Sequence, residues 1–367
     1  VLELCLRGVR EGLLDLRWYV LCPQCRGPAQ RGTSLADLRL GEAHCESCQI
    51  GFDAELDRSV EIGFRPSGSI RDVGEVEFCV GGPQVTPHVV VQQLVPPQTT
   101  RELTVPLEPG RYRLRSPAGT QLLLAEHGAP ASPDAEGRVG LQASLQLENP
   151  TDEPKVVALE RAAWGDQAAT AADVGALQLF RDLFAREALR PGEQVAVGST
   201  AVLFTDLRDS TRFYREVGDA PAFGAVMSHL DVLRRVVDEE EGAVVKTMGD
   251  AVMAVFRRPA GAVRAVLRAH DELPERFVLK AGVHAGPCIA VAQNDRLDYF
   301  GSTVNAAARL VGLSNGSDVV VSDAVFRDPE VAELAAGLRA EPVEAELKGF
   351  DERFDVWRLT PGAPLAS

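Results

Sequence analysis

Four cysteines near the start of the chain place the strictest constraint on its fold. They form two Cys-x2-Cys pairs, Cys22 with Cys25 and Cys45 with Cys48, and nineteen residues separate the pairs. This spacing is typical of a zinc ribbon, in which two tight knuckles supply four thiolates to one tetrahedral Zn²⁺. The spacing therefore predicts one structural Zn²⁺ per chain, in a module too small to fold on an apolar core alone.

The spacing alone leaves two alternatives to a zinc site: the four cysteines could form two disulfides, or a Cys-x2-Cys pair could be a thioredoxin-like redox motif. Disulfides would require export, and no signal peptide is visible, whereas a redox motif needs only one Cys-x2-Cys pair. A closed site of four thiolates has no position for a substrate, so we expect the zinc to stabilise the module and to do no chemistry. A helical pattern is already in progress at Val1, so we also expect further residues before it.

Charge and composition exclude several functional classes. The chain of 367 residues has 38 Lys and Arg against 53 Asp and Glu, a net charge of −15. This acidic balance argues against a nucleic-acid partner, because such proteins present a basic surface to the phosphates. No run approaches the roughly 18 apolar residues of a membrane span. We therefore expect a cytoplasmic protein with no nucleic-acid and no membrane partner.

The pattern of apolar residues changes along the chain and predicts separate domains. Residues 1–75 read as a helix followed by the zinc-ribbon module. Residues 76–165 contain six short strand-like segments at about ten-residue spacing, separated by Pro- and Gly-rich turns, which predicts a small all-β sandwich with a regulatory role. Residues 166–194 form a linker, and residues 195–360 form a last domain of mixed pattern.

The linker has helical periodicity over residues 170–189. Its apolar residues recur at helical spacing, and they are Val174, Leu177, Phe180, Leu183 and Phe184. The pattern predicts one helix of twenty residues. Such a helix either packs on its own chain or pairs with its copy in a dimer, and the pattern leaves both open.

The last domain alternates strands and helices in the order βαββαβ. This order is typical of a ferredoxin-like α+β fold, which predicts a two-layer arrangement with helices on one face of the sheet. Three polar segments interrupt the apolar pattern, at residues 204–211, 246–250 and 298–309. Each segment is weak evidence alone, because a strand-ending aspartate can cap a helix and a Gly-Asp pair can simply form a turn.

Together, the three segments and their spacing resemble the catalytic domain of class III nucleotidyl cyclases, over roughly residues 195–359. Six residues match functional positions of that family. They are the metal ligands Asp206 and Asp250, the base-reading pair Lys246 and Asp298, and the transition-state residues Asn305 and Arg309. Lys348 resembles the family's phosphate-contacting lysine. The upstream region resembles the regulatory part of some soluble bacterial adenylate cyclases.

The resemblance implies an adenylate cyclase, a phosphorus-oxygen lyase of signal transduction that converts ATP to 3′,5′-cyclic AMP and pyrophosphate. It implies two Mg²⁺ or Mn²⁺ ions per active site and a homodimer whose two subunits share each site. Adenine has an acceptor at N1 and a donor at its 6-amino group, which a lysine and a carboxylate satisfy, and guanine reverses both. Lys246 and Asp298 therefore favour ATP as substrate.

Two readings from other classes compete with this one. The domain could be a catalytically silent dimerisation or sensing module, which six intact positions argue against. The helix and zinc ribbon could belong to a transcription regulator, which the acidic balance argues against. An unidentified regulatory ligand or protein is a further expected partner of the N-terminal region.

Overall fold

The computed structural model divides the chain into two compact units. One contains Val1–Val73 and Ala169–Ser367, and the other contains Gly74–Ala168. The structure describes residues 1–22, 27–41, 43–46, 49–73, 89–116, 119–134, 137–161, 168–185, 187, 189–190, 192–274, 276–347, 349–350 and 353–361. Among these residues, no helix has both the length and the apolar character needed to cross a bilayer.

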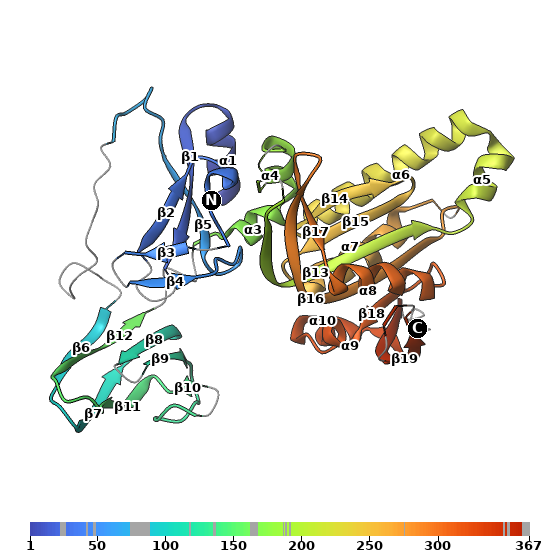
Figure 1. The fold of residues 1–367 in the computed structure, drawn as a ribbon. Coiled ribbons are helices and arrows are strands. Elements are labelled where there is room, and N and C mark those ends of the chain that lie inside the picture. Colours follow the sequence, from blue (N-terminus) through green and yellow to red (C-terminus); the bar gives the residue numbers. More distant parts are fainter. Residues whose placement is uncertain are drawn as a thin grey trace. The chain divides into compact units, whose positions relative to one another are not determined.

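The N-terminal part of the first unit is a small α+β module (Figure 1). Its elements are α1 (Leu2–Arg10), β1 (Leu14–Leu21), β2 (Pro28–Gly32), the 3-10 helix η1 (Leu35–Asp37), β3 (Ala43–Cys45), β4 (Ile50–Phe52) and β5 (Val60–Pro66). Strands β2, β1 and β5 form an antiparallel sheet in that order, and β3 pairs with β4. The alternating pattern of β1 buries Trp18 and Val20 completely, so one face of this sheet packs in a core.

The predicted zinc ligands are only partly within the described residues. Cys22 follows β1, Cys45 ends β3, and both are buried. Cys25 and Cys48 lie outside the described residues, and the zinc ribbon therefore stays a prediction.

The linker differs from the single helix that its periodicity predicts. It contains two short helices, α3 (Ala171–Gly175) and α4 (Gln178–Leu183). A capping box between Thr170 and Asp173 starts α3, whereas Leu177 has an extended backbone (φ −95°, ψ 126°) that separates the two helices. The prediction of one helix over residues 170–189 is wrong because periodicity continues through this break.

The apolar stripe of the linker packs within its own chain. Val174 and Phe180 are almost completely buried. The Phe180 ring meets the Trp18 ring edge-on, with 6.1 Å between centroids and an interplanar angle of 88°. The sequence leaves open whether this stripe packs on its own chain or pairs with its copy in a dimer. In the structure, it packs on its own chain.

The C-terminal part of the first unit contains an eight-stranded sheet. Its elements are β13 (Gln194–Leu207), α5 (Ser210–Val217), α6 (Asp219–Glu239), β14 (Gly242–Met248), β15 (Ala251–Phe256), α7 (Pro259–Glu272), β16 (Leu279–Gln293), β17 (Arg296–Phe300), α8 (Ser302–Leu310), the 3-10 helix η2 (Val311–Leu313), β18 (Val319–Ser322), α9 (Asp323–Phe326), α10 (Pro329–Ala335), β19 (Leu338–Glu346) and β20 (Arg353–Pro361). The strand order is β14-β15-β13-β16-β18-β20-β19, and β17 pairs with β16. From β13 to β16 the elements follow the expected βαββαβ order, with antiparallel neighbours.

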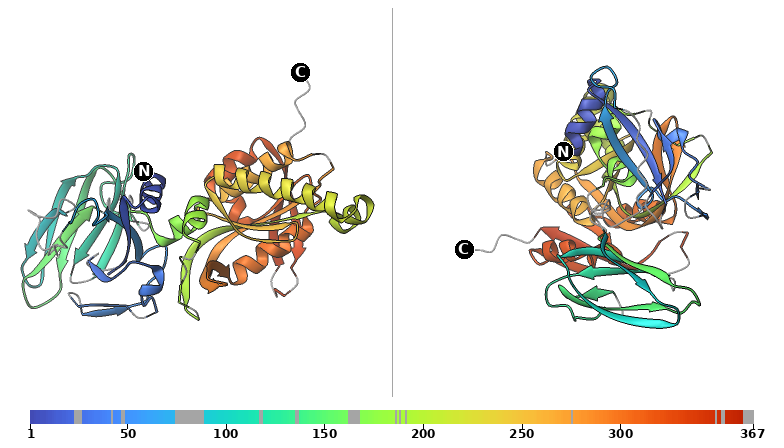
Figure 2. Two further views of the ribbon diagram at one scale, coloured as in Figure 1. Left: turned by 90° about the horizontal axis from the view of Figure 1, so that it is seen from above. Right: turned by 90° about the vertical axis from the view of Figure 1, so that its left-hand side faces the viewer.

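Both faces of this sheet are covered, which corrects the expectation of helices on one face. Residues 200–205 of β13 are all buried, so the side chains that point to either side are removed from water. Leu203 packs in one core with residues of α6 and α7, which lie along the same face of the sheet (Figure 2). Val202 packs in another core, with Val304 of α8, residues of α3 and α4, and the N-terminal module.

In its described residues, the second unit contains strands and no helix. Its strands are β6 (Val89–Val95), β7 (Thr99–Pro106), β8 (Gly110–Ser116), β9 (Gly119–Ala125), β10 (Arg138–Val139), β11 (Gln142–Asn149) and β12 (Lys155–Arg161). They form a sheet in the order β10-β9-β8-β12-β6 and a separate pair, β11-β7. Residues from both sheets share one apolar core, which is compatible with the predicted sandwich. The assignment of this unit to that class stays a prediction.

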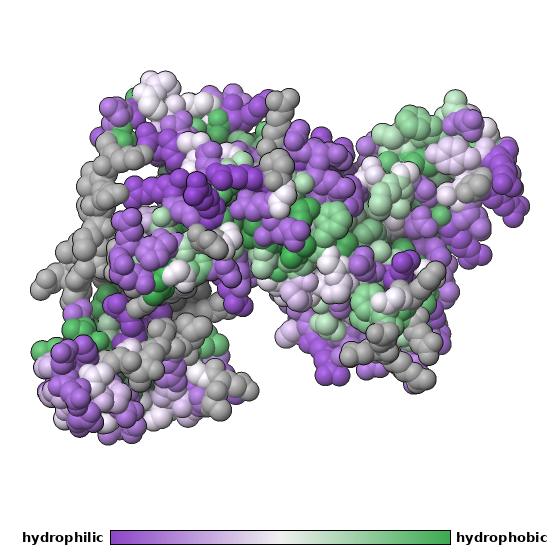
Figure 3. Space-filling model, in the orientation of Figure 1, coloured by the Kyte–Doolittle hydropathy of each residue, from purple (hydrophilic) through white to green (hydrophobic). Residues whose placement is uncertain are grey.

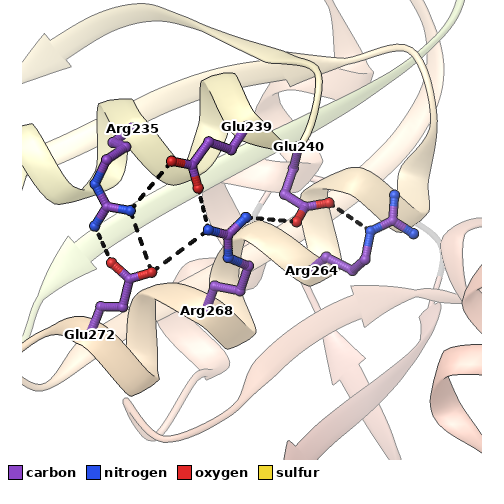
Figure 4. Close-up of polar contacts among 6 residues, drawn as sticks. All are labelled: Arg235, Glu239, Glu240, Arg264, Arg268 and Glu272. Atoms are coloured by element: carbon purple, nitrogen blue, oxygen red, sulfur yellow. Dashed lines mark hydrogen bonds and ion pairs between the residues drawn. The ribbon is translucent and has the colours of Figure 1, made fainter.

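A network of ion pairs joins α6 to α7 on the outer surface (Figure 4). Its six members are Arg235, Glu239, Glu240, Arg264, Arg268 and Glu272. At one end, Glu240 accepts from Arg264 Nε at 2.6 Å and from Arg268 Nη1 at 3.0 Å. Burial is the largest single influence on the pKa of Glu240 and raises it, but the hydrogen bonds and positive charges of the two arginines together leave this pKa below its usual value.

Glu240→Gln tests the contribution of this network to stability. A carboxyl with a lowered pKa in the folded state contributes stability above its unfolded pKa and loses that contribution as the pH falls through its folded pKa. We expect the variant to lose on the order of 1 kcal/mol of unfolding free energy near neutral pH, and less in acid and in high salt. Thermal unfolding measures this, with the exposed Glu333→Gln on α10 as control. Equal melting of wild type and Glu240→Gln at neutral pH and low salt would contradict it.

Candidate active site

Asp206 and Asp250 lie at the same end of the central strands. Asp206 is the next-to-last residue of β13, and Asp250 lies in the turn between β14 and β15, where Gly249 adopts a positive φ of 68°. Because β13 pairs with β15, Asp206 and Asp250 lie at the same end of these two paired strands. The backbone N–H of Leu207 donates to Asp250 Oδ2 at 3.3 Å. The structure thus brings together the two residues that the resemblance assigns to metal binding.

The charges around these two carboxylates are unbalanced. Burial raises the pKa of the Asp206 carboxyl, and the neighbouring charge of Asp250 raises this pKa further. Lys280, opposite Asp206 on β16, lowers the same pKa but does not cancel the rise. Two carboxylates with excess negative charge are a donor set that fits a hard divalent cation such as Mg²⁺ or Mn²⁺.

The protein supplies only part of a full coordination shell at this place. Within the described residues, no group of three or more His, Cys, Asp or Glu side chains is arranged to hold a metal ion. Sites of two carboxylates are typical of Mg²⁺, which keeps waters and binds substrate phosphates as further ligands.

His229 on α6 is a supporting residue that the sequence analysis missed. Its ring Nε2 lies 3.3 Å from the backbone oxygen of Asp250, and its ring packs on Phe277 with 5.8 Å between centroids. Burial lowers the pKa of His229, which favours the neutral ring and a hydrogen bond to that carbonyl. A signal was present in the sequence, because His229 shares a helical stripe with Val226 and Leu233, both buried.

Lys246 and Asp298 form an ion pair although their strands are not neighbours. Lys246 Nζ lies 2.7 Å from Asp298 Oδ2, and the Asp298 side chain is only 8% exposed. The other carboxylate oxygen of Asp298 accepts from the Tyr299 backbone N–H at 2.8 Å. Lys246 Nζ also lies 5.2 Å from the centroid of the Phe300 ring. The predicted base-reading pair is therefore assembled within one chain.

Asn305 and Arg309 share an exposed face of α8, four residues apart. In the described part of the chain, no hydrogen bond or ion pair engages the Arg309 guanidinium. Nor does one join this pair to the two carboxylates at the end of β13 or to the ion pair of Lys246. Within the described residues of one chain, the predicted site residues therefore form three groups that no hydrogen bond or ion pair joins. Lys348, the predicted phosphate contact, lies outside the described residues.

The C-terminal part of the chain matches a known family. Residues 193–334 match the adenylate and guanylate cyclase catalytic domain. This part of the chain is a nucleotidyl cyclase domain. Residues 1–77, which contain the predicted zinc ribbon, match a family of unknown function (DUF5939).

Relatives of the cyclase domain include named adenylate cyclases. The chain is 30% identical over 172 residues to an adenylate cyclase of Lachancea kluyveri, a match that covers 39% of this chain and 9% of that protein. It is 32% identical over 155 residues to the pH-sensitive adenylate cyclase of Mycobacterium tuberculosis, covering 40% of this chain and 38% of the relative. The adenylyl cyclase CyaB of P. aeruginosa has a solved structure that aligns with a TM-score of 0.41 and 17% identity, over 47% of this chain and 98% of that one. The matches thus cover well under half of each of the two sequence relatives.

Asp206→Asn tests the electrostatics of the two carboxylates in the cyclase domain. A carboxyl whose pKa is raised in the folded state opposes folding once the pH exceeds that pKa. We therefore expect the variant to melt above wild type at neutral pH in the presence of a chelator, with an advantage that shrinks as the pH falls through the pKa of Asp206. Asp231→Asn, at an exposed position of α6, is the control. A variant that melts below wild type under these conditions would refute the assignment of excess negative charge.

Proposed function

We propose that the protein is an adenylate cyclase that converts ATP to 3′,5′-cyclic AMP and pyrophosphate in signal transduction. The observation that carries this proposal is the ion pair of Lys246 and Asp298, with 2.7 Å between Nζ and Oδ2. An ammonium has three donors and a carboxylate accepts about four hydrogen bonds, so each group keeps capacity for a base after pairing. The pair therefore presents a donor for adenine N1 beside an acceptor for the 6-amino group.

The other predicted residues have matching tasks. Asp206 and Asp250 would hold Mg²⁺ or Mn²⁺, which when bound polarises the ribose 3′-hydroxyl and neutralises phosphate charge. Lys280, paired across the sheet with Asp206, adds a positive charge beside this site. The exposed guanidinium of Arg309 has its planar fork available for a phosphoryl oxygen as negative charge develops there. Asn305, one turn earlier on α8, would orient the ribose.

The proposal includes a homodimer with each active site shared between two copies. In the class that the chain resembles, the metal ligands come from one subunit, and the base-reading and transition-state residues come from the other. Two observations support the extension to this chain. No hydrogen bond or ion pair joins these groups within the described residues of one chain, and the cyclase domain has exposed apolar side chains that a partner would cover. Figure 3 shows hydrophobic surface over α5 and α6, where Phe223 is 61% exposed.

The N-terminal region completes the proposal. Cys22, Cys25, Cys45 and Cys48 would hold one structural Zn²⁺, and the module would act on the cyclase domain in response to an unidentified ligand or protein. A cytoplasmic location is part of the same proposal, since ATP is the substrate.

Exchange of the base-reading pair tests the substrate. We expect Lys246→Glu with Asp298→Cys to lower ATP turnover and raise the relative use of GTP, because the donor and acceptor pattern is reversed. Each unpaired group costs roughly 1–3 kcal/mol. Cyclic product from ATP and GTP is measured side by side in Mn²⁺. The control carries the same exchanges in the second unit, Lys155→Glu with Asp152→Cys. An unchanged preference for ATP would refute this role, and a wild type that turns over neither nucleotide would favour a silent sensing module.

Mixed dimers test the shared site. Asp206→Ala removes a metal ligand and Asn305→Ala removes a transition-state contact, so each homodimer is expected to be severely impaired. A mixed dimer collects both lesions in one site and leaves the other intact. Random association makes half of the dimers mixed, so activity should recover to about a quarter of wild type. Absence of recovery after verified subunit exchange, or full activity in a demonstrated monomer, would exclude the shared site.

A further inference from the structure

The helix α4 lies against the two strands that carry the base-reading pair (Figure 1). Two polar residues, Gln178 and Arg181, lie three positions apart on this helix, and each bonds to the backbone of a different strand. Helical residues at this spacing lie on one face. The short helix thus bridges β14 and β17.

Gln178 binds β14 next to Lys246. β14 is an edge strand of the sheet, and Gln178 Oε1 accepts from the Val244 backbone N–H at 2.8 Å. Gln178 is only 6% exposed, and its Nε2 donates to Asp182 on the next turn at 2.8 Å. The register of β14 shifts between Val244 and Lys246, where one extra residue forms a bulge. A bulge changes the direction of the side chains that follow it. The hydrogen bond from Val244 to Gln178 therefore fixes β14 at the bulge that determines the direction of the Lys246 side chain.

Arg181 binds β17 next to Asp298. Its Nη1 donates to the carbonyl oxygen of Leu297 at 3.0 Å, and its Nε donates to the carbonyl oxygen of Gly175 at 2.8 Å. The guanidinium lies 5.5 Å from the centroid of the buried Tyr299 ring. Arg181 therefore contacts the residue before Asp298 and the residue after it.

The strands β14 and β17 are not hydrogen-bonded to each other. In hydrogen-bonding order, β15, β13 and β16 separate β14 from β17. We propose that Gln178 and Arg181 are positioning residues that set the spacing and direction of Lys246 and Asp298, and that they thereby set the preference between adenine and guanine nucleotides. This inference rests on the adenylate cyclase function proposed above.

Methionine substitutions in the full-length protein test the inference. Gln178→Met and Arg181→Met remove the hydrogen bonds and keep an unbranched side chain. Arg296→Met is the matched control, since Arg296 is exposed on β17. The ratio of kcat/KM for ATP to that for GTP is measured, together with equilibrium binding of the α,β-methylene analogues of both nucleotides, which cannot be cyclised. We expect the ATP preference to fall roughly three- to tenfold in each test variant, the worth of one hydrogen bond, and to stay constant in the control.

A conservative variant separates positioning from folding. Arg181→Lys keeps the charge but lacks the fork that reaches two carbonyl oxygens, so its ATP preference should lie between wild type and Arg181→Met. If a methionine variant fails to fold, Arg181→Lys against Arg296→Lys provides the same comparison. An unchanged ratio in folded test variants, or equal losses with ATP and GTP, overturns the inference alone. A wild type that neither turns over a nucleotide nor binds an analogue overturns the proposed function and this inference together.

Discussion

The burial of residues 200–205 of the central strand β13 is the constraint on which the rest of the first unit depends. Residues 200–205 are removed from water on both sides of the sheet, so each side requires its own covering layer. The helices α6 and α7 provide one layer, and α8, the linker helices and the N-terminal module provide the other. Asp206 lies where this buried run ends, and His229, Asn305 and Arg309 come from the covering helices. The helices that bury residues 200–205 of β13 therefore also carry several of the predicted site residues and the supporting residue His229.

Sequence reasoning predicted the features that depend on local pattern. The βαββαβ order follows from the alternation of period-two and helical segments, and the meeting of Asp206 with Asp250 follows from a strand end beside a hairpin turn. The break at Leu177 was missed because apolar periodicity runs through it, although the backbone there is extended. The contacts of Gln178 and Arg181 were also missed, because they join residues 66 and 116 positions apart, and no local pattern reports such a distance.

Charged side chains are balanced in one part of the first unit and unbalanced in another. Between α6 and α7, carboxylates and guanidinium groups alternate, and each member of the network has a partner of opposite charge. At Asp206 and Asp250, two carboxylates approach each other and burial raises the pKa of Asp206. The first arrangement stabilises the fold, whereas the second costs stability in the absence of a cation. Such a local cost is common where a site is built for a ligand.

The hydrogen bond between Gln178 and Val244 also bears on solubility. An edge strand with free backbone groups is a template on which the strand of another molecule can pair, and this is a common start of aggregation. β14 is at the edge of its sheet, and α4 covers it there with a buried side chain bonded to a backbone N–H. The linker therefore covers the edge strand β14 at Val244, and a cyclase domain produced without residues 178–183 would expose the backbone of β14 there to a neighbouring molecule.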